Sequence, residues 1–287
     1  MQSQRKPQPL NTRFIVRGLI VALVVLIVAL VAISLLPPQW LGSMLVAWQS
    51  NQPPEATPLP PTITAPRGAL PAGPVGLQEQ RRYQGGQYEL IGSGFLLQLE
   101  GGPVVGVTTA HSLVELGSPL VKLDGVAFAA SGKTPFIEFD TLYGVPGVAF
   151  SSQDFSVDYV LLKLPANSPA IDPALVLHPD QRSGPQPGER VMLFSGLGDG
   201  QGGPRALAGT VQLANATTIW ALMDEQFEPG QMSGSPLLSQ HTGQVVGMTV
   251  AAAFRRGHTL LGFHPIGSIV RHAQAADAFP KILDYKR

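Results

Sequence analysis

Residues 230–236 read Gly-Gln-Met-Ser-Gly-Ser-Pro and lead directly into an apolar pair, Leu237-Leu238. Because glycine permits tight backbone turns, this stretch predicts a short turn that presents Ser233 in front of a strand. Two upstream segments carry polar residues that would complement such a serine. They are Thr108-Thr109-Ala110-His111 and Asp158, which precedes the apolar run 159–164. In chain order the three polar residues are His, Asp and Ser, one of the known orders of the hydrolytic triad.

Composition favours short strands over long helices. The 287 residues include 32 glycines and 27 prolines, and only 13% are charged, which fits a chain with many turns. The formal net charge is zero and no basic block follows the N-terminus, which argues against nucleic acid as a partner. The absence of cysteine excludes disulfides and thiolate metal sites. No histidine or carboxylate spacing predicts a metal, and no cofactor is expected.

The N-terminal part predicts a single membrane-spanning helix. Residues 18–36 form an apolar run with one polar member, Ser34. At about 1.5 Å per residue this run is long enough to cross a hydrocarbon core of about 30 Å. Four cations and no acid precede it: Arg5, Lys6, Arg13 and Arg17. We therefore expect residues 1–17 in the cytoplasm and the rest of the chain on the other side of the lipid bilayer. A cleaved secretory signal is the alternative, but its apolar core is usually shorter, about 7–15 residues.

Two further segments follow the predicted helix. Residues 37–74 are a juxtamembrane and proline-rich linker, which favours an extended, semi-rigid spacer, although a tether of no set length fits equally. Residues 75–287 form the main domain, in which short apolar runs bounded by Gly and Pro predict strands. A proline-rich segment at 165–188 divides these runs into two groups. We therefore expect an all-β domain of two small barrels, with one helix at about residues 268–278.

Six short motifs recur in order along residues 92–269. They are Gly92-Ser93-Gly94-Phe95, Thr108-Thr109-Ala110-His111, Asp158 before an apolar run, Glu189-Arg190-Val191, Ala208-Gly209-Thr210-Val211 and Ser233-Gly234-Ser235-Pro236. Together they resemble the chymotrypsin-fold serine proteases, in particular the compact bacterial kind that includes the high-temperature-requirement proteases. The resemblance implies two six-stranded antiparallel β-barrels and a His111–Asp158–Ser233 triad.

The chemistry of such a triad explains why these residue types are needed. A serine hydroxyl is a poor nucleophile until a base takes its proton, and His111 is the candidate base. Asp158 would accept a hydrogen bond from the other ring nitrogen and stabilise the imidazolium. The backbone N–H groups of Gln231 and Ser233 would point at the substrate oxygen and form an oxyanion hole.

Each candidate has alternatives. Asp140 and Asp154 are rivals of Asp158, but neither directly enters an apolar run. Ser235 also flanks Gly234, but only Ser233 is followed by Gly-x-Pro. The remaining histidines are expected at turns, loops or the surface: His178, His241, His258, His264 and His272.

Two positions depart from the family pattern. The family commonly has Gly two residues before the serine and Asp one before, whereas this chain has Gln231 and Met232. Gly allows backbone conformations that Gln resists, so Gln231 leaves the formation of the oxyanion hole open. Met232 has no carboxylate, so activation by a new N-terminal amine that pairs with this position is not expected.

The resemblance also implies a substrate pocket, formed by Phe227, Glu228 and Thr249-Val250-Ala251. Phe227 would occupy the pocket base, where trypsin-like enzymes have Asp. Small or apolar substrate side chains are therefore expected rather than Arg or Lys, although Glu228 at the rim leaves attraction of a cation open.

The sequence thus predicts a single-pass membrane protein with an extracytoplasmic trypsin-like domain that hydrolyses peptide bonds in proteins or peptides. A second hypothesis is a catalytically silent relative that binds a peptide or protein partner in the same region. The Gln231-Met232 pair favours this alternative, and the complete triad favours the enzyme.

Overall fold

The computed structural model describes Leu23 and residues 57–286. Within that range it leaves out residues 114–115, 119–121, 131–132, 151–153, 169, 198–204 and 256. At residues 133–136 and 254–255 only the backbone is described. Apart from Leu23, the membrane helix expected at 18–36 lies outside these residues. Within them, no helix is long and apolar enough to cross a membrane. The chain divides into two units, Met1–Gln49 and Ser50–Arg287, and the fold described below belongs to the second.

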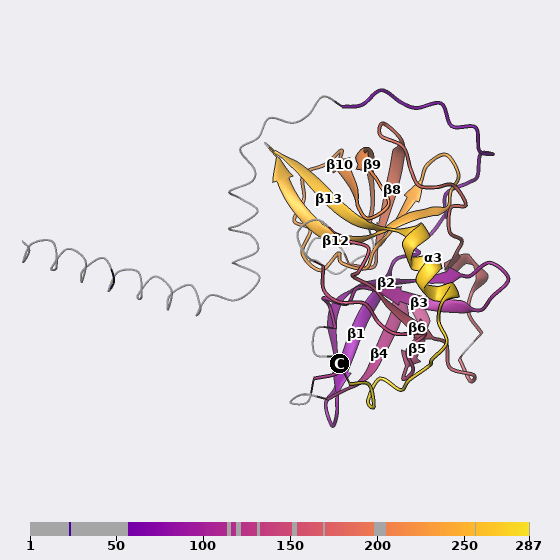
Figure 1. The fold of residues 1–287 in the computed structure, drawn as a ribbon, viewed down its shortest axis with the longest axis vertical. Helices are drawn as coiled ribbons and strands as arrows, with labels where there is room; N and C mark the ends of the chain where they lie inside the picture. Colours follow the sequence, from indigo (N-terminus) through magenta and orange to yellow (C-terminus); the bar gives the residue numbers. More distant parts are fainter. Residues whose placement is uncertain are drawn as a thin grey trace, which may run out of the picture. The chain divides into compact units, whose positions relative to one another are not determined.

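Six strands of the C-terminal half close into a barrel, drawn in orange and yellow in Figure 1. In barrel order they are β10 (Ile219–Met223), β13 (His258–Pro265), β12 (Val245–Arg255), β11 (Pro236–Ser239), β8 (Arg190–Ser195) and β9 (Arg205–Ala214). Every neighbouring pair runs antiparallel. Alternate side chains of β10 point into a core that also holds Leu193, Leu237 and Phe263. Closure leaves no free sheet edge, so this barrel is a firm support for the loops between its strands.

The N-terminal half forms a sheet of seven strands, six of which follow one another in a single path. Its order is β5 (Lys133–Phe139), β4 (Leu123–Ala130), β1 (Leu77–Tyr83), β2 (Tyr88–Gln98), β3 (Val104–Thr108) and β6 (Val160–Lys163). These pairs are antiparallel, and a two-residue strand, β7 (Val176–Leu177), joins β2 in parallel after the 3-10 turn η1 (Pro173–Leu175).

The predicted all-β fold is confirmed, with one difference. The first barrel is a half-barrel, since the described residues form no ladder between β5 and β6. The described residues between these strands form instead an irregular segment with isolated bridges from Thr141 to Lys281 and from Leu142 to Leu162. Residues of that irregular segment are therefore available to build loops beside β6.

An apolar cluster outside the core of the closed barrel joins the two halves. Phe95 and Leu97 of β2 meet Leu238 and Met248 of the closed barrel in one buried group. The helix α3 (Ile266–Gln274) contributes Ile266, Ile269 and Ala273 to the same group, at the spacing of one helical face. The predicted C-terminal helix is confirmed, although it begins directly after Pro265 and ends at Gln274. Pro265 has a φ of −66°, which proline favours and which leads into the first helical turn. Shared burial makes the two halves one packed unit.

The second half of the predicted linker packs on the closed barrel rather than extending as a spacer. The Gly68 N–H donates to the His241 carbonyl at 2.9 Å, and His241 Nε2 lies 2.6 Å from the Ala65 carbonyl oxygen. A Cβ atom at Gly68 would lie 2.0 Å from the Thr242 carbonyl oxygen, so the two backbones are in direct contact. We call residues 65–74 the strap. His241, expected at a solvated turn, is half-buried because the strap covers it.

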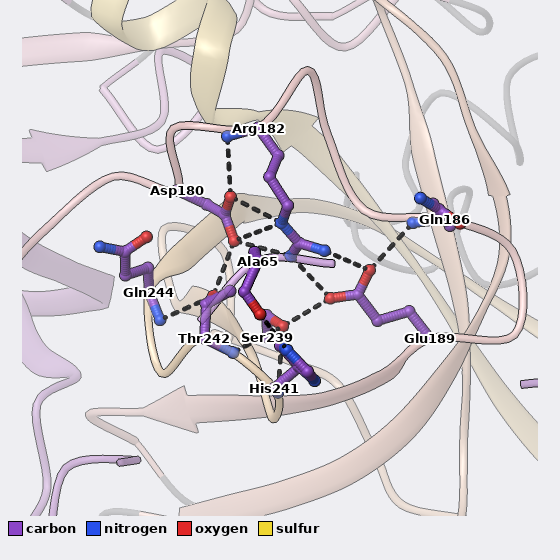
Figure 2. A network of polar contacts seen from close by, with 9 residues as sticks. All are labelled: Ala65, Asp180, Arg182, Gln186, Glu189, Ser239, His241, Thr242 and Gln244. Carbon is purple, nitrogen blue, oxygen red and sulfur yellow. Dashed lines mark hydrogen bonds and ion pairs between the residues drawn. The ribbon is translucent and has the colours of Figure 1, made fainter. Parts of the chain in front are cut away.

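A buried ion-pair network supports the turn on which the strap lies (Figure 2). The Arg182 guanidinium lies between two carboxylates, with Nη2 at 2.7 Å from Asp180 Oδ2 and 2.8 Å from Glu189 Oε1. The Thr242 hydroxyl donates to Asp180 at 2.7 Å, and the Ser239 hydroxyl donates to Glu189 at 2.5 Å. Burial alone would raise the pKa of the Asp180 carboxyl, but the bonds from Arg182 and Thr242 hold that pKa below its ordinary value.

Replacing Arg182 should destabilise the domain strongly. Arg182→Met leaves two nearly inaccessible carboxylates without their cation, so the free energy of unfolding should fall by about 3–5 kcal/mol in urea titrations. The control is Arg190→Met, whose guanidinium pairs with Asp224 at the surface. Its loss should change stability by about 0–1 kcal/mol. Equal losses in the two variants would contradict the structural role of the buried network.

Candidate active site

The three polar residues singled out in the sequence meet at one place. His111 Nε2 lies 2.8 Å from Ser233 Oγ, and His111 Nδ1 lies 2.7 Å from Asp158 Oδ2. His111 follows the end of β3, Asp158 precedes β6, and Ser233 precedes β11. The half-barrel therefore supplies the imidazole and the carboxylate, and the closed barrel supplies the hydroxyl. The imidazole remains partly exposed, with 27% of its side-chain surface accessible, while the Asp158 side chain is fully buried.

Asp158 is held as a charged acceptor. Its Oδ1 accepts from the backbone N–H groups of Ala110 and His111, at 2.6 and 3.1 Å. Its Oδ2 accepts from the Phe150 N–H at 3.1 Å in addition to the imidazole. Burial alone would raise the pKa of this carboxyl, but the bonds from His111 and from the backbone outweigh it and lower the pKa. An anionic Asp158 keeps the proton on Nδ1, so Nε2 is the acceptor that faces the Ser233 hydroxyl.

The two rival aspartates have other partners. Asp154 accepts from the N–H and the hydroxyl of Ser156, which makes it a turn residue. Asp140 pairs with Lys281 at 2.6 Å on the exposed surface. Within the described residues no group of three or more His, Asp or Glu side chains is arranged to hold a metal ion.

The irregular segment before β6 contributes an aromatic cover that sequence reasoning missed. The Phe150 ring meets the His111 ring edge-on, with centroids 5.8 Å apart. Phe150 in turn contacts Phe155, which contacts Trp220 of β10. This row shields one side of the imidazole from water. Nothing in the sequence singles out Phe150, since it belongs to no strand pattern and to none of the recognised motifs.

The turn before Ser233 leaves two backbone donors unused. The N–H groups of Met232, Gly234 and Ser235 donate to carbonyl oxygens of the protein. Those of Gln231 and Ser233 have no acceptor among the described residues. Met232 is fully buried in the core of the closed barrel, which explains the apolar side chain directly before Ser233.

Solved structures share this architecture. No protein-family model and no curated protein matches the chain. The thermostable serine protease AL20 from an extremophilic microorganism matches with a TM-score of 0.50 and 13% identity, over 71% of this chain and 97% of that one. The solved structure of GrC matches with a TM-score of 0.50 and 18% identity, over 74% and 98%. The fold is that of the trypsin-like serine proteases.

One longer protein matches over only part of its own length. An HtrA-type protease, AlgW, with a tripeptide, has a TM-score of 0.49 and 17% identity, over 71% of this chain. The match covers 60% of that protease, so the present chain spans less than two thirds of its length. At such identities the likeness concerns the fold, and the chemistry rests on the residues of the chain itself.

The backbone at Gln231, two residues before Ser233, is left-handed. Gln231 has a φ of +65° and is the one non-glycine residue with a positive φ in the described part of the chain. That conformation costs an L-residue about 1–2 kcal/mol, because Cβ approaches the following carbonyl. The turn is therefore strained where the sequence placed an oxyanion-hole donor.

Gln231→Gly should relieve this strain. Glycine adopts a positive φ freely but loses more chain entropy on folding, so the net gain in the free energy of unfolding should be about 0.5–1 kcal/mol. The matched control is Gln226→Gly, at an exposed position without a positive φ, which should lower stability instead. Urea titration of the three proteins measures the effect. A destabilising Gln231→Gly would show that the left-handed turn is absent in solution.

The predicted pocket residues come from two segments, the loop before the serine turn and strand β12. Phe227 packs in the core of the closed barrel, and its backbone N–H and carbonyl both bond to the Thr259 hydroxyl at 3.0 Å. Glu228 is exposed beside it. Thr249 carries its own contacts to the turn, since its carbonyl accepts from Gly234 and its hydroxyl donates to the Ser235 carbonyl. Val250 and Ala251 belong to the apolar cluster between the two halves.

His264 is a site residue that the sequence placed wrongly. It was expected at a loop or the surface, but it lies fully buried on β13. Its Nδ1 is 3.2 Å from the Asp158 carbonyl oxygen, and Tyr159 meets it edge-on. Burial lowers its pKa to about 4, so the ring is neutral at pH 7 and Nδ1–H donates to that carbonyl. His264 thus supports the backbone of Asp158 from behind.

His264 should make the fold sensitive to acid. Its native pKa of about 4 lies below the ordinary 6.5, so the unfolded chain binds the proton more readily between these values. The free energy of unfolding should fall as pH falls from 6.5 to 4, by on the order of 3 kcal/mol. His264→Asn keeps a donor but cannot titrate, and it should remove this slope in urea titrations. His258→Asn, at an exposed position of the same strand, should keep it. An unchanged slope in His264→Asn would contradict the assignment.

Proposed function

We propose that this domain is a serine endopeptidase, with Ser233 as nucleophile, His111 as general base and Asp158 as the group that orients the base. The observation that carries the proposal is the continuous relay from the Ser233 hydroxyl through both imidazole nitrogens to the Asp158 carboxylate, with heavy-atom distances of 2.8 and 2.7 Å. These distances lie within the reach that general-base catalysis requires. The trypsin-like fold supports this proposal.

The reaction follows from this geometry. Ser233 Oγ attacks the carbonyl carbon of the scissile peptide bond as its proton passes to His111 Nε2. Asp158 stabilises the imidazolium through the Nδ1–H bond. When the tetrahedral intermediate collapses, the C–N bond breaks and His111 returns the proton to the leaving amine. A water molecule, deprotonated by His111, then cleaves the acyl–Ser233 ester and restores the hydroxyl.

The unused donors of the serine turn support an oxyanion hole. The N–H groups of Gln231 and Ser233 have no protein acceptor in the described part of the chain, whereas their neighbours do. In the proposed enzyme both would donate to the oxygen of the tetrahedral intermediate. One such donor typically lowers the barrier by about 2.7–4 kcal/mol.

Substrate and location belong to the same proposal. The apolar Phe227 and the absence of an acid at this position favour small or apolar side chains before the scissile bond, with protein or peptide as substrate. The predicted membrane helix at 18–36 would anchor the protease domain at the outer face of the cell membrane.

A catalytically silent peptide-binding domain is the second candidate. The strained Gln231, where the family has Gly, is the observation that favours it. The intact relay weighs against it, because binding alone requires no hydrogen bond between Ser233 and His111.

Labelling with a fluorophosphonate distinguishes the two. The full chain, solubilised in detergent, should react covalently at Ser233 Oγ. Ser233→Ala should abolish the label, and His111→Ala should reduce its rate by at least about 10³-fold. Ser235→Ala, which removes the neighbouring buried hydroxyl, should label like the wild type. Circular dichroism verifies that each variant is folded.

Two results would contradict the proposal. A folded wild type that does not label would favour the silent binding domain. A label that survives Ser233→Ala would assign the nucleophile to another serine.

A further inference from the structure

A buried carboxyl group lies beneath the candidate active site, and the proposed mechanism does not use it. Glu79 on β1 is fully inaccessible to solvent. Neither of its carboxyl oxygens has a hydrogen-bond partner within the described residues. Burial raises its pKa to about 8, and the neighbouring Thr108 hydroxyl and Arg81 charge oppose this only in part. Glu79 is therefore protonated at neutral pH.

The carboxyl group lies at the junction of the nucleophile and base segments. Glu79 pairs with Gly92 across β1 and β2. A Cβ atom at Gly92 would lie 3.0 Å from Glu79 Oε2, 3.3 Å from the Ser233 carbonyl oxygen and 3.5 Å from Ser112 Oγ. Because Gly92 has no side chain, the Glu79 carboxyl group, the Ser233 carbonyl group and the Ser112 hydroxyl all lie close to its Cα.

The surrounding hydrogen bonds make this junction important for alignment. The Ser93 N–H donates to the Ser233 carbonyl at 2.9 Å, and this bond ties the serine turn to β2. Ser112 Oγ lies 2.6 Å from Thr109 Oγ1, which ties the segment of His111 together. A change at Glu79 therefore reaches both sides of the Ser233–His111 contact.

The charge around Glu79 determines which protonation state this junction tolerates. The charged group that faces it is Arg81 on the same strand, whose Nη1 also lies 3.4 Å from the Ser112 carbonyl oxygen. The other elements packed against it contribute Gly92 from β2, Phe128 from β4 and Thr108 from β3. The nearby imidazole of His111 is engaged through both nitrogens, by Asp158 and by Ser233. The serine turn, residues 230–235, carries no ionisable side chain.

We propose that Glu79 is a positioning residue whose neutral form keeps the Ser233 turn against β2, and whose ionisation loosens that turn and lowers activity at alkaline pH. A neutral carboxyl group adds no charge at this junction, whereas a carboxylate adds a buried negative charge beside the Ser233 carbonyl dipole. The inference about activity rests on the proposed function, and the inference about the turn does not.

The first test is the rate of fluorophosphonate labelling of the full chain from pH 5 to 10. In the wild type the rate should fall about tenfold per pH unit above pH 8, because the inactive form carries one proton fewer. Glu79→Gln imitates the neutral acid and should remove this alkaline fall. Glu89→Gln, at an exposed position of β2, should retain it. If Glu79→Gln does not fold, Glu79→Met, which is similar in length and cannot ionise, takes its place. An alkaline fall that is the same in the wild type and the Glu79 variant overturns the inference.

The second test does not depend on activity. Amide hydrogen exchange at Ser93 reports directly on its bond to the Ser233 carbonyl. Protection of this amide, corrected for the intrinsic rate, should fall above pH 8 in the wild type but not in Glu79→Gln. If the wild type fails to label at any pH, the proposed function fails, and Ser93 exchange alone decides the role of Glu79. Equal Ser93 protection above pH 8 in the wild type and in Glu79→Gln overturns the proposed role of Glu79.

Thermal unfolding checks that Glu79 ionises at all. Its native pKa of about 8 exceeds the ordinary 4.5, so the unfolded chain releases the proton first as pH rises. The Tm of the wild type should therefore fall relative to Glu79→Gln between pH 5 and 8. A constant difference in Tm would contradict a buried, titrating Glu79.

Discussion

One backbone hydrogen bond joins the two halves of this domain at its candidate active site. The Ser93 N–H of the half-barrel donates to the carbonyl of Ser233, which belongs to the closed barrel. Gly234 makes this approach possible, since a Cβ atom there would lie 1.8 Å from the Ser93 carbonyl oxygen. The hydroxyl of Ser233 and the imidazole of His111 are carried by different halves. Their 2.8 Å contact therefore depends on how closely β2 and the serine turn meet.

Three titratable side chains are buried around this junction, and each avoids an unpaired charge differently. Asp158 remains ionised because four donors, three of them backbone N–H groups, surround its carboxylate. His264 remains neutral and donates to the Asp158 carbonyl. Glu79 remains neutral without a comparable set of donors. Buried polar groups that are only partly satisfied lower stability, and such groups are typical of functional sites.

The strap shows that the folded domain extends further towards the N-terminus than its strand pattern indicates. Residues 65–74 contain no strand, yet backbone contacts with the turn at His241–Gly243 fix part of this segment on the closed barrel. The turn is itself anchored by the Asp180–Arg182–Glu189 network (Figure 2). Proline-rich composition predicts an extended backbone, but it carries no information on what that backbone touches. Docking depends on the close approach of two glycines to opposing carbonyl groups, which is a property of the packed surfaces.

Local features of the sequence were sufficient for the all-β class and for the C-terminal helix, and they singled out His111, Asp158 and Ser233, whose side chains the fold brings together. Each depends on a short pattern: an apolar run bounded by glycine or proline, or a polar residue at the edge of such a run. The left-handed Gln231, the Phe150 cover, buried His264 and buried Glu79 followed no such pattern. Their roles depend on contacts between residues that are distant in the chain, such as Glu79 with the Ser233 turn. Burial and the resulting pKa are properties of the packed fold, because they depend on which remote groups exclude water from a side chain.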